Sequence, residues 1–330
     1  MNKKVITFGE ILLRLTPADN FSFEQAPACE KSFGGSEANV AVALAGYGLN
    51  SAYVSKLPDN IIGQAALNAL RRYGVDTSFI ARGGSRVGMY VLEKGFSPCS
   101  AVCTYDRADS AMSQACPKDF NWRKIFDRAD WFHFSGITPA LSPTLARICL
   151  SACKAAKEHG LTVSCDVNYR SKLWDMEKAS AVMQQLCQYV DVLIVNEEEA
   201  KVLGADMTEE DPVSGFHSQI EFLQKNYPCS VIAAAARLND NTAAQAVIWD
   251  GTIRYSQVYP LHTVDPVGAG DAFCAAFIYG IIRRMHTDEL INFAAAACAL
   301  KHGIKGDFNL ASVDTVRQLM KNNGHTGVQR

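Results

Sequence analysis

The chain has 330 residues, of which 48% are hydrophobic and 20% charged, a composition typical of one large α/β domain or two smaller ones. Its formal net charge of −2 gives no reason to expect a nucleic acid or an anionic membrane as a partner. No run approaches the roughly 18–20 apolar residues that span a bilayer, and the amino-terminal segment is typical of a first strand rather than a signal peptide. We therefore expect a cytoplasmic protein whose positive potential is local and holds a particular anion.

The 11 cysteines do not form a pattern typical of a disulfide framework or of a zinc site. No two of them are spaced as C-x-x-C, and most lie within apolar runs. We expect reduced, packed thiols, as in a reducing compartment.

The first hundred residues predict a strand-rich segment around two helices. The alternation from Val5 to Glu10 is typical of a buried first strand, which we expect to continue through Leu15. Residues 19–30 are polar with aromatics among them and indicate a loop or a lid strand. The other expected elements are a strand at 51–56, a helix capped by Asp59 that ends near Tyr73, a short strand at 77–81, and strands at 88–94 and 101–107.

Gly34 and Gly35 form a turn that opens an apolar helix, which we expect to end near Gly46. Because glycine has no side chain, a ligand can approach the backbone closely at this turn. Asn39 lies near the start of the helix, where its amide can hydrogen-bond a substrate hydroxyl. A tight turn followed by a satisfied polar residue is the alternative interpretation of the same pattern.

The two strands at 88–94 and 101–107 carry Tyr90, Tyr105 and Arg107. If these side chains share one face, the tyrosines offer a flat wall with hydroxyl groups and the arginine offers a forked donor for a carboxylate. An ordinary exposed hairpin is the alternative.

From Trp122 onward strands and helices alternate regularly, which predicts a parallel sheet covered by helices on both faces. The expected strands lie at 131–135, 161–166, 191–195, 230–235 and 244–250, and the expected helices at 142–159, 175–189, 197–203, 215–226, 269–284, 287–302 and 312–322. Ligands of such sheets bind beyond the carboxyl ends of the strands. Polar residues gather there, in Asp166-x-Asn168-x-Arg170, in Asn196-x-x-Glu199 and from Gly268 to Asp271.

The run from Asp265 to Phe273 carries the most specific chemistry. Gly268 and Gly270 allow a tight turn whose N–H groups face inward at a helix N-terminus, which favours an anion. Asp271 can accept a hydroxyl proton while those N–H groups stabilise the charge on a transferring phosphoryl group. The same residues also fit a strand-to-helix loop with the aspartate as N-cap. A dinucleotide site fits less well, since Phe273 stands where a third glycine is expected, and no P-loop sequence occurs.

These motifs resemble those of the ribokinase (PfkB) family of ATP-dependent sugar kinases over nearly the whole chain. The resemblance rests on Asp265-x-x-Gly268-Ala269-Gly270-Asp271-Ala272-Phe273, on Gly34-Gly35-x-x-x-Asn39 and on Asn196-x-x-Glu199. Within the family the chain is most similar to 2-keto-3-deoxygluconate kinases, by Gly9-Glu10, Tyr90, Tyr105-x-Arg107, Asp166-x-Asn168-x-Arg170 and the run from Lys301 to Phe308.

The resemblance implies an α/β, three-layer α/β/α ribokinase-like fold with a central, mostly parallel sheet and a small β lid. One kinase domain would cover residues 1–330, with lid segments at about 11–30 and 85–110. It further implies ATP and Mg²⁺ as cofactors, a small sugar acid as the partner, and a homo-oligomer, a dimer or larger, that forms through the lid.

The resemblance also implies residue roles. Asp271 would be the base for the primary hydroxyl of the sugar, and the amides of Gly268, Ala269, Gly270 and Asp271 would form the anion hole. Expected substrate contacts are Gly34, Gly35, Asn39, Tyr90, Tyr105, Arg107 and Arg170. Expected ATP contacts are Asn168, Arg170, Asn196, Arg237, Gly268 and Gly270. Glu199 with Asn196 would place Mg²⁺ largely through water, and Asp265 with the Val267 carbonyl would bind a monovalent cation such as K⁺.

The chain departs from the family pattern at two places near the expected nucleotide. Ala233 to Ala236 replaces a segment in which relatives usually carry threonine, and Ala295 stands where many carry asparagine. Both departures bear on nucleotide affinity or preference rather than on the chemistry of Asp271.

Our leading hypothesis is a kinase that transfers the γ-phosphate of ATP to the primary hydroxyl of 2-keto-3-deoxygluconate. Arginines at 107 and 170 favour a sugar acid, because a neutral sugar needs no guanidinium. The alternatives are a fructokinase or another PfkB sugar kinase, a non-catalytic sugar-binding or regulatory protein, and, with the least support, a dehydrogenase.

Overall fold

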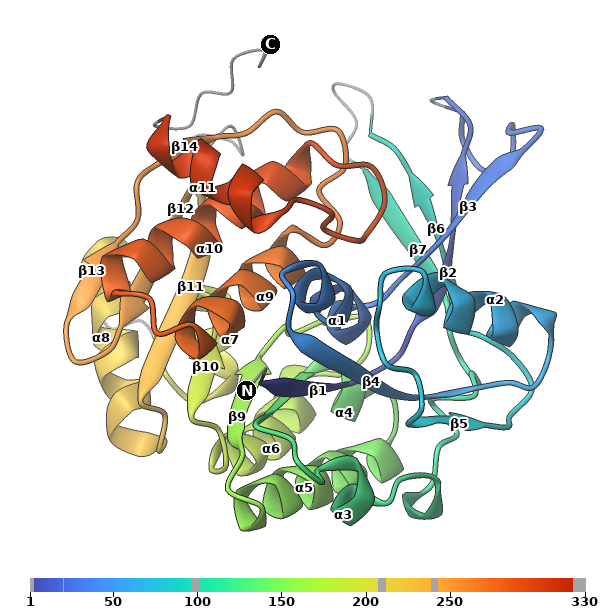
Figure 1. Cartoon of the computed structure of the whole chain (residues 1–330), viewed down its shortest axis with the longest axis horizontal. Coiled ribbons are helices and arrows are strands. Elements are labelled where there is room, and N and C mark those ends of the chain that lie inside the picture. Colours follow the sequence, from blue (N-terminus) through green and yellow to red (C-terminus); the bar gives the residue numbers. More distant parts are fainter. Residues whose placement is uncertain (1–2, 20, 96–100, 207–211, 239–242, 323–330) are drawn as a thin grey trace.

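The computed structural model describes residues 3–19, 21–95, 101–206, 212–238 and 243–322. In this part of the chain a 10-stranded sheet runs in the order β13-β12-β11-β10-β9-β8-β1-β4-β5, with β14 beside β12 (Figure 1). Its strands are β1 (Lys4–Phe8), β4 (Asn50–Leu57), β5 (Ile80–Arg82), β8 (Trp131–Ser135), β9 (Thr162–Asp166), β10 (Val192–Ile194), β11 (Val231–Leu238), β12 (Ala243–Trp249), β13 (Ile253–Tyr255) and β14 (Tyr259–Pro260).

The central strands are apolar on both faces because helices cover both faces. Val5 and Trp131 belong to one buried apolar cluster, whereas their neighbours Ile6 and Phe132 belong to the cluster on the opposite face. Successive side chains of a strand point to opposite faces, and here both faces of the sheet are buried. The expected three-layer α/β/α arrangement is confirmed.

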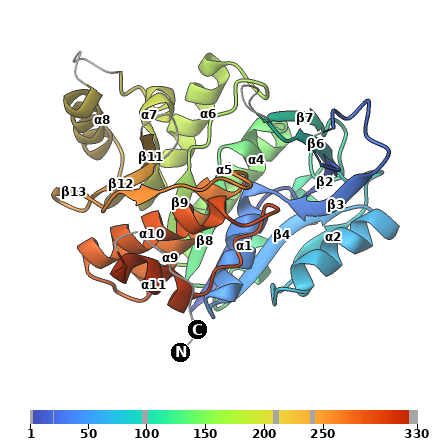
Figure 2. The same cartoon turned by 90° about the horizontal axis from the view of Figure 1, so that it is seen from above.

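Figure 2 shows the two helical layers on either side of the sheet. One layer packs against the cluster around Ile6 and Phe132, and the other against the cluster around Val5 and Trp131. The first layer holds α3 (Trp122–Ile125), α5 (Pro143–Glu158), α6 (Met176–Cys187), α7 (Glu197–Val202) and α8 (Pro212–Asn226), with α4 (Ile137–Ala140) beside α5. The second holds α1 (Ser36–Gly46), α9 (Ala269–Ile282), α10 (Thr287–His302) and α11 (Val313–Lys321), with α2 (Ile61–Arg71) beside α1.

A second sheet, here called the lid sheet, has the order β3-β2-β6-β7 and stands at one side of the molecule (Figure 1). It consists of β2 (Leu12–Pro17), β3 (Cys29–Gly34), β6 (Met89–Glu93) and β7 (Val102–Asp106). Strands β2 and β6 are parallel, and β6 and β7 form the expected antiparallel hairpin. Strands β2, β6 and β7 lie within the predicted lid segments at about 11–30 and 85–110, whereas β3 extends beyond the first segment to Gly34.

The expectation that the first strand continues to Leu15 is wrong, because the chain leaves the central sheet after Phe8. At Gly9 the backbone passes the side chain of Glu37 so closely that an added Cβ would lie 2.0 Å from Glu37 Oε2. This close passage turns the chain, and Leu12 begins a new strand in the lid sheet. The polarity pattern continues across the turn, which is why the two strands look like one in the sequence.

Several element boundaries and directions also differ from the predictions. Helix α2 is capped by Asn60, not Asp59: the Asn60 side chain accepts hydrogen bonds from Ile62 N at 3.1 Å and Gly63 N at 2.9 Å. Strand β12 runs antiparallel to β11, so the sheet is parallel only from β11 to β5. Short elements that the sequence analysis did not predict are α3, α4, β13, β14 and a 3₁₀ turn at Pro117–Asp119.

No helix in the described ranges is both long enough and apolar enough to cross a bilayer. The cysteines that the structure describes are free thiols, and most are buried in the apolar clusters. The expectation of packed, unpaired thiols is confirmed for them.

The cap of α2 gives a direct test of local stability. Asn60→Ala removes the acceptor for two N–H groups and should lower the free energy of unfolding by about 1 kcal/mol. Asp59→Ala is the matched control: Asp59 is exposed and pairs with Arg82 at 3.2 Å, so its loss should change stability by less than about 0.5 kcal/mol. Urea denaturation of both variants measures the difference, and equal losses would refute the assignment of the cap.

Candidate active site

Three polar clusters lie near one another at the carboxyl ends of the central strands. Asp166 ends β9, Asn196 follows β10, and the turn before α9 begins at Asp265. The side-chain charges of Glu199 and Asp271 both perturb the pKa of Asp166, which places all three carboxylates within electrostatic reach of one another. The sequence prediction that these clusters share one edge of the sheet is thus confirmed.

Gly268 shapes the turn that opens α9. Its φ is +85°, in the left-handed region, and an added Cβ would lie 2.1 Å from the carbonyl oxygen of Asp307. Both facts require glycine. The first intrahelical hydrogen bond of α9 runs from Ala272 N to Gly268 O at 2.9 Å, so the N–H groups of Gly270 and Asp271 have no intrahelical acceptor. With the helix dipole, these N–H groups favour an anion at this end of α9.

Asp271 does not cap α9, because Gly268 is the N-cap residue and the capping alternative is therefore wrong. The Asp271 carboxylate instead reaches across to α1. Ser36 Oγ donates to Asp271 Oδ1 at 2.7 Å, and Asn39 Nδ2 donates to Asp271 Oδ2 at 2.7 Å. Burial raises the pKa of Asp271, while the hydrogen bonds from Asn39 and Ser36 favour its charged form and oppose that shift. Two donors from α1 thereby fix the orientation of the carboxylate.

The Asn39 amide has two partners in the structure. Besides its bond to Asp271, its Oδ1 accepts a hydrogen bond from Gly35 N at 3.2 Å. The expected contact between Asn39 and a substrate hydroxyl stays a prediction. The geometry shows a positioning role, in which the Gly34-Gly35 turn orients Asn39 and Asn39 orients the carboxylate.

Asn168 connects Asp271 to a second carboxylate. Its Nδ2 donates to Asp166 Oδ2 at 3.0 Å and to Ser36 Oγ at 3.3 Å, and its φ of +41° is an uncommon left-handed conformation. Its Oδ1 is buried and lacks a hydrogen-bond partner among the described residues. A buried acceptor of this kind is costly unless a ligand or ion satisfies it.

The Asp166 and Glu199 side chains are buried where a negative charge is disfavoured. Burial is the main cause that raises the pKa of Asp166, and the negative charges of Glu199 and Asp271 raise it further. Burial likewise raises the pKa of Glu199. The exposed guanidinium of Arg170 opposes these shifts, and its Nη1 donates to Tyr169 O at 3.0 Å. The pair thus fits a site that gains a divalent cation together with phosphate.

Glu199 and Asn196 form a capping box at the start of α7. Asn196 Oδ1 accepts from Glu199 N at 2.9 Å, and Glu199 Oε2 accepts from Asn196 N at 3.1 Å. In the described part of the chain, no group of three or more His, Cys, Asp or Glu side chains is arranged to hold a metal directly. The residues fit the predicted Mg²⁺ only as a hydrated ion, which is the form that this cation usually keeps.

The lid sheet brings Tyr90 and Tyr105 together. Their rings stack with centroids 5.4 Å apart and an interplanar angle of 30°. Tyr90 is buried, and its hydroxyl donates to Asp307 Oδ2 at 2.7 Å, whereas Tyr105 is 46% exposed and forms the outer face of the pair. Only Tyr105 therefore offers an open ring to a ligand.

Arg107 is part of an ion pair within the lid region. Its Nε donates to Glu10 Oε2 at 2.8 Å, and its Nη2 contacts the same oxygen. Glu10 Oε1 accepts a hydrogen bond from Ser110 Oγ. Among the described residues, these bonds engage two of the five N–H groups of Arg107, so both N–H groups of Nη1 and the second of Nη2 can still donate to a ligand. The expected forked contact with a substrate carboxylate stays a prediction, and with Glu10 in place it would use Nη1 and Nη2.

Sequence analysis missed Arg14, which lies at the centre of a buried network. Arg14 Nη2 donates to Asp265 Oδ2 at 2.6 Å, and Arg14 Nη1 donates to Asp307 Oδ1 at 2.8 Å. The sequence pattern gives little signal, because Arg14 and Thr16 share the more polar face of β2, opposite Leu13 and Leu15. The structure nevertheless buries that face, and a buried charge needs a partner. Ser36, Lys301 and Asp307 were likewise given no individual role.

The expected nucleotide side is described only in part. Ala233 and Ala234 are buried in β11, and Ala295 is buried in the apolar cluster of α9 and α10. The side chains of Ala235, Ala236 and Arg237 lie outside the described residues. The expected contact between Arg237 and ATP therefore stays a prediction.

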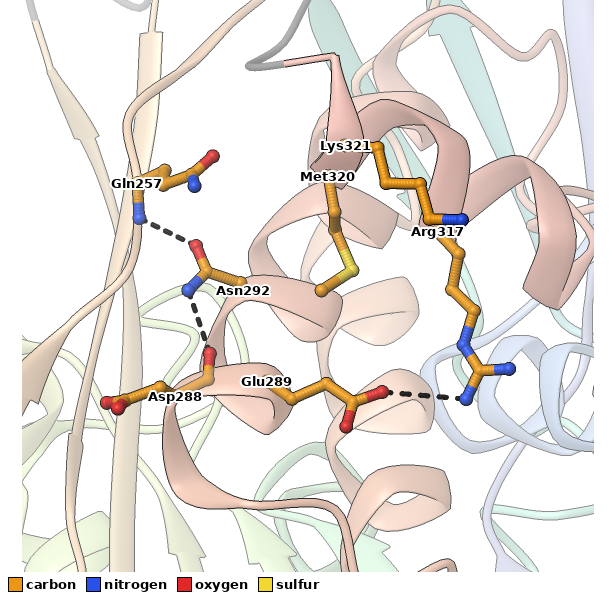
Figure 3. Close-up of a pocket in the computed structure, with 7 residues that line it drawn as sticks. All are labelled: Gln257, Asp288, Glu289, Asn292, Arg317, Met320 and Lys321. Carbon is orange, nitrogen blue, oxygen red and sulfur yellow. Dashed lines mark hydrogen bonds and ion pairs between the residues drawn. The ribbon is translucent and has the colours of Figure 1, made fainter.

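A pocket between α10, α11 and the segment around Gln257 is separate from these clusters (Figure 3). In it, Asn292 bridges Gln257 N and the carbonyl oxygen of Asp288, both at 2.8 Å, and Arg317 faces Glu289 at 3.5 Å. None of its lining residues belongs to the predicted site. The pocket is lined by Gln257, Asp288, Glu289, Asn292, Arg317, Met320 and Lys321.

Comparison with known proteins adds independent evidence. The model of the pfkB family of carbohydrate kinases matches residues 2–309. The 2-dehydro-3-deoxygalactonokinase of Haloferax volcanii is 33% identical, with 100% of each chain covered. The 2-dehydro-3-deoxygluconokinase of Thermotoga maritima is 43% identical, with a TM-score of 0.94 over 97% of this chain and 99% of that one. A candidate ribokinase II from E. coli, solved with ATP and Mg²⁺, is 18% identical with a TM-score of 0.83 over 97% of this chain and 99% of that one, which shows the shared fold.

The contact between Asn39 and Asp271 predicts a specific pH effect. Asn39→Ala removes a hydrogen bond that favours the carboxylate, so the pKa of Asp271 should rise further. As the pH is lowered, a carboxylate with a higher pKa takes up a proton sooner, that is, at a higher pH. The protonated group can no longer act as a base. The acid limb of the kcat/KM profile should move to higher pH, with a larger loss of activity in mildly acidic than in mildly alkaline buffer. A uniform loss at all pH values would contradict this role for Asn39.

Proposed function

The chain belongs to the pfkB family of carbohydrate kinases, and we propose that it phosphorylates the primary hydroxyl of a 2-keto-3-deoxy sugar acid with ATP. The family match establishes a sugar-phosphorylating phosphotransferase and leaves the dehydrogenase alternative without support. The substrate, the role of each residue and the dependence on ATP are the proposal. The non-catalytic alternative is disfavoured because the whole Asp271 site is present.

One observation carries the proposed mechanism: the Asp271 carboxylate is fixed by Ser36 and Asn39 beside two N–H groups at the start of α9. In the proposed reaction the sugar hydroxyl transfers its proton to Asp271 as its oxygen bonds to the γ-phosphorus. The bond between that phosphorus and the β–γ bridging oxygen breaks, and ADP leaves with the electron pair. The N–H groups of Gly270 and Asp271 stabilise the charge on the phosphoryl oxygens.

The Asp166 and Glu199 carboxylates suit the proposed use of ATP together with Mg²⁺. When bound, Mg²⁺ would neutralise phosphate charge, and Asp166 and Glu199 would hold its water ligands. Asn168 would present its unsatisfied Oδ1 to the same waters. Arg170, which is exposed and whose charge acts on both Asp166 and Tyr105, would contact phosphate or the sugar acid.

The choice of a sugar acid is supported by the names of the relatives and by the two arginines. The two similar proteins named above act, by their names, on 2-dehydro-3-deoxy sugar acids, one with the galacto and one with the gluco configuration. A buried or half-buried guanidinium that bonds a carboxylate contributes about 1.5–3 kcal/mol. A neutral sugar is the second candidate, because Arg107 is already ion-paired with Glu10.

We also propose self-association through the lid sheet. Its outer strand β7 is mostly exposed, and Val102 on it is 49% exposed. Phe21 and Phe23, in the loop that joins β2 and β3, are 44% and 49% exposed. Exposed aromatic and β-branched side chains next to an open strand edge are suited to contact with a second copy.

Replacing the proposed base tests the mechanism. Asp271→Asn keeps the size of the side chain but cannot accept the proton, so kcat should fall by about 10²–10⁴-fold. Asp288→Asn is the matched control, since Asp288 is also in the first turn of a helix but is exposed and pairs with Arg254 at 3.3 Å. A coupled assay of ADP release measures kcat, and calorimetry checks that ATP still binds. Appreciable turnover by Asp271→Asn would rule out this residue as the base.

A substrate panel tests the proposed specificity. We expect the two epimeric 2-keto-3-deoxy acids to exceed 5-dehydro-2-deoxygluconate, fructose and ribose in kcat/KM. Arg107→Met and Arg170→Met should each reduce kcat/KM for the acids by about tenfold or more, with a much smaller effect on neutral sugars. Arg86→Met is the control, because Arg86 lies in the same segment and pairs with the exposed Asp106. Equal losses for acids and neutral sugars would argue against recognition of a carboxylate.

A further inference from the structure

Lys301 places a buried ammonium group behind the turn that opens α9. It lies in the last turn of α10, and its side chain is fully buried. Its Nζ donates to the carbonyl oxygen of Ile304 at 2.9 Å and to that of Asp265 at 3.2 Å. An ammonium group enclosed by main-chain carbonyl oxygens takes the position that a monovalent cation takes in a protein site.

A second resident cation lies on the other side of Asp265. Arg14 bonds the carboxylates of Asp265 and Asp307 at 2.6 and 2.8 Å, and all three side chains are at most 3% exposed. Lys301 and Arg14 supply two positive charges, and Asp265 and Asp307 supply two negative charges. These four charges thus cancel one another without any added ion. An uncompensated charge in such a place is costly, so a further cation is disfavoured.

Hydrogen-bond donors already contact both oxygens of the Asp265 side chain. Asp265 Oδ1 accepts from Val267 N at 3.2 Å, and Asp265 Oδ2 accepts from Gly306 N at 2.9 Å as well as from Arg14. Donors therefore face both carboxylate oxygens. Together with the balanced charges of Lys301, Arg14, Asp265 and Asp307, these contacts argue against the monovalent cation that the sequence resemblance implied at Asp265 and Val267.

We propose that Lys301 is a built-in substitute for this cation, so that the enzyme needs no K⁺. The ammonium group ties three segments together: the carboxyl end of α10, the loop at Ile304 and the segment before the α9 turn. That loop leads to Asp307, whose carbonyl oxygen is in close contact with Gly268. Lys301 is therefore a positioning residue that holds the proposed phosphate-binding turn from behind. The inference rests on the proposed function only in calling this turn phosphate-binding.

Negative charges near Lys301 favour its charged, ammonium form. Burial lowers the pKa of Lys301, and the negative charges of Asp265 and Asp307 act against that shift. The last turn of α10 adds the negative end of the helix dipole.

The first test is an ion titration of the unmodified protein. The melting temperature without substrate, and separately kcat, are measured in KCl and in choline chloride at equal ionic strength. A protein that binds K⁺ in its folded state would gain stability from it, whereas Lys301 predicts no gain and kcat values within about twofold. A higher melting temperature and faster turnover in K⁺ overturn the proposal. Because the melting temperature needs no substrate, this result does not depend on which sugar the enzyme phosphorylates.

The second test removes the ammonium group. Lys301→Ala should lower the melting temperature and reduce kcat by about tenfold or more in choline, because the turn loses its support. Methylammonium, NH₄⁺ or K⁺ should partly restore both, which a loss of packing alone would not permit. Lys305→Ala is the matched control: Lys305 lies in the same loop but is exposed and pairs with Glu30 at 2.6 Å. Its behaviour should match that of the unmodified protein.

If Lys301→Ala does not fold, Lys301→Met keeps the volume of the side chain and removes only its charge, and the ion titration of the unmodified protein stands by itself. A Lys301 variant with normal stability and turnover in choline overturns the proposal. So does a defective Lys301→Ala protein that no cation restores, since the role of the side chain would then be packing rather than charge.

Discussion

The contact between the first turns of α1 and α9 is the constraint on which the site depends. Two donors from α1, Ser36 and Asn39, hold both oxygens of the Asp271 carboxylate. Asp271 lies where the N–H groups of α9 have no intrahelical acceptor, so the proposed base and the proposed anion site share one helical turn. Neither helix alone makes this arrangement, and the packing of α1 on α9 fixes the geometry.

The network around Arg14 extends that constraint to the lid sheet. Arg14 belongs to β2 of the lid sheet but bonds Asp265 before α9 and Asp307 after α10, and Tyr90 of β6 bonds the other oxygen of Asp307. Removing one member of a buried charge pair costs about 3–5 kcal/mol. Buried ionic contacts therefore join the lid sheet to the turn that opens α9. The position of the lid sheet and the shape of this turn depend on each other.

The turn before α9 could be predicted because its backbone demands a particular residue. Gly268 is required by its positive φ and by its contact with Asp307, and Asp271 by its place in the first helical turn. The partners of charged groups could not be predicted in the same way. Arg14 bonds residues 251 and 293 positions away, and Arg107 pairs with Glu10, 97 positions away. Likewise, the antiparallel direction of β12 follows from its pairing with β11, not from its own apolar pattern.

A structure of the complex with ADP, a planar phosphoryl mimic such as aluminium fluoride and the sugar acid would test the central claim most directly. The account predicts that the mimic lies against the N–H groups of Gly270 and Asp271, with the primary hydroxyl about 3 Å from an oxygen of Asp271. A mimic bound away from the start of α9, or a sugar hydroxyl with no contact to Asp271, would contradict it.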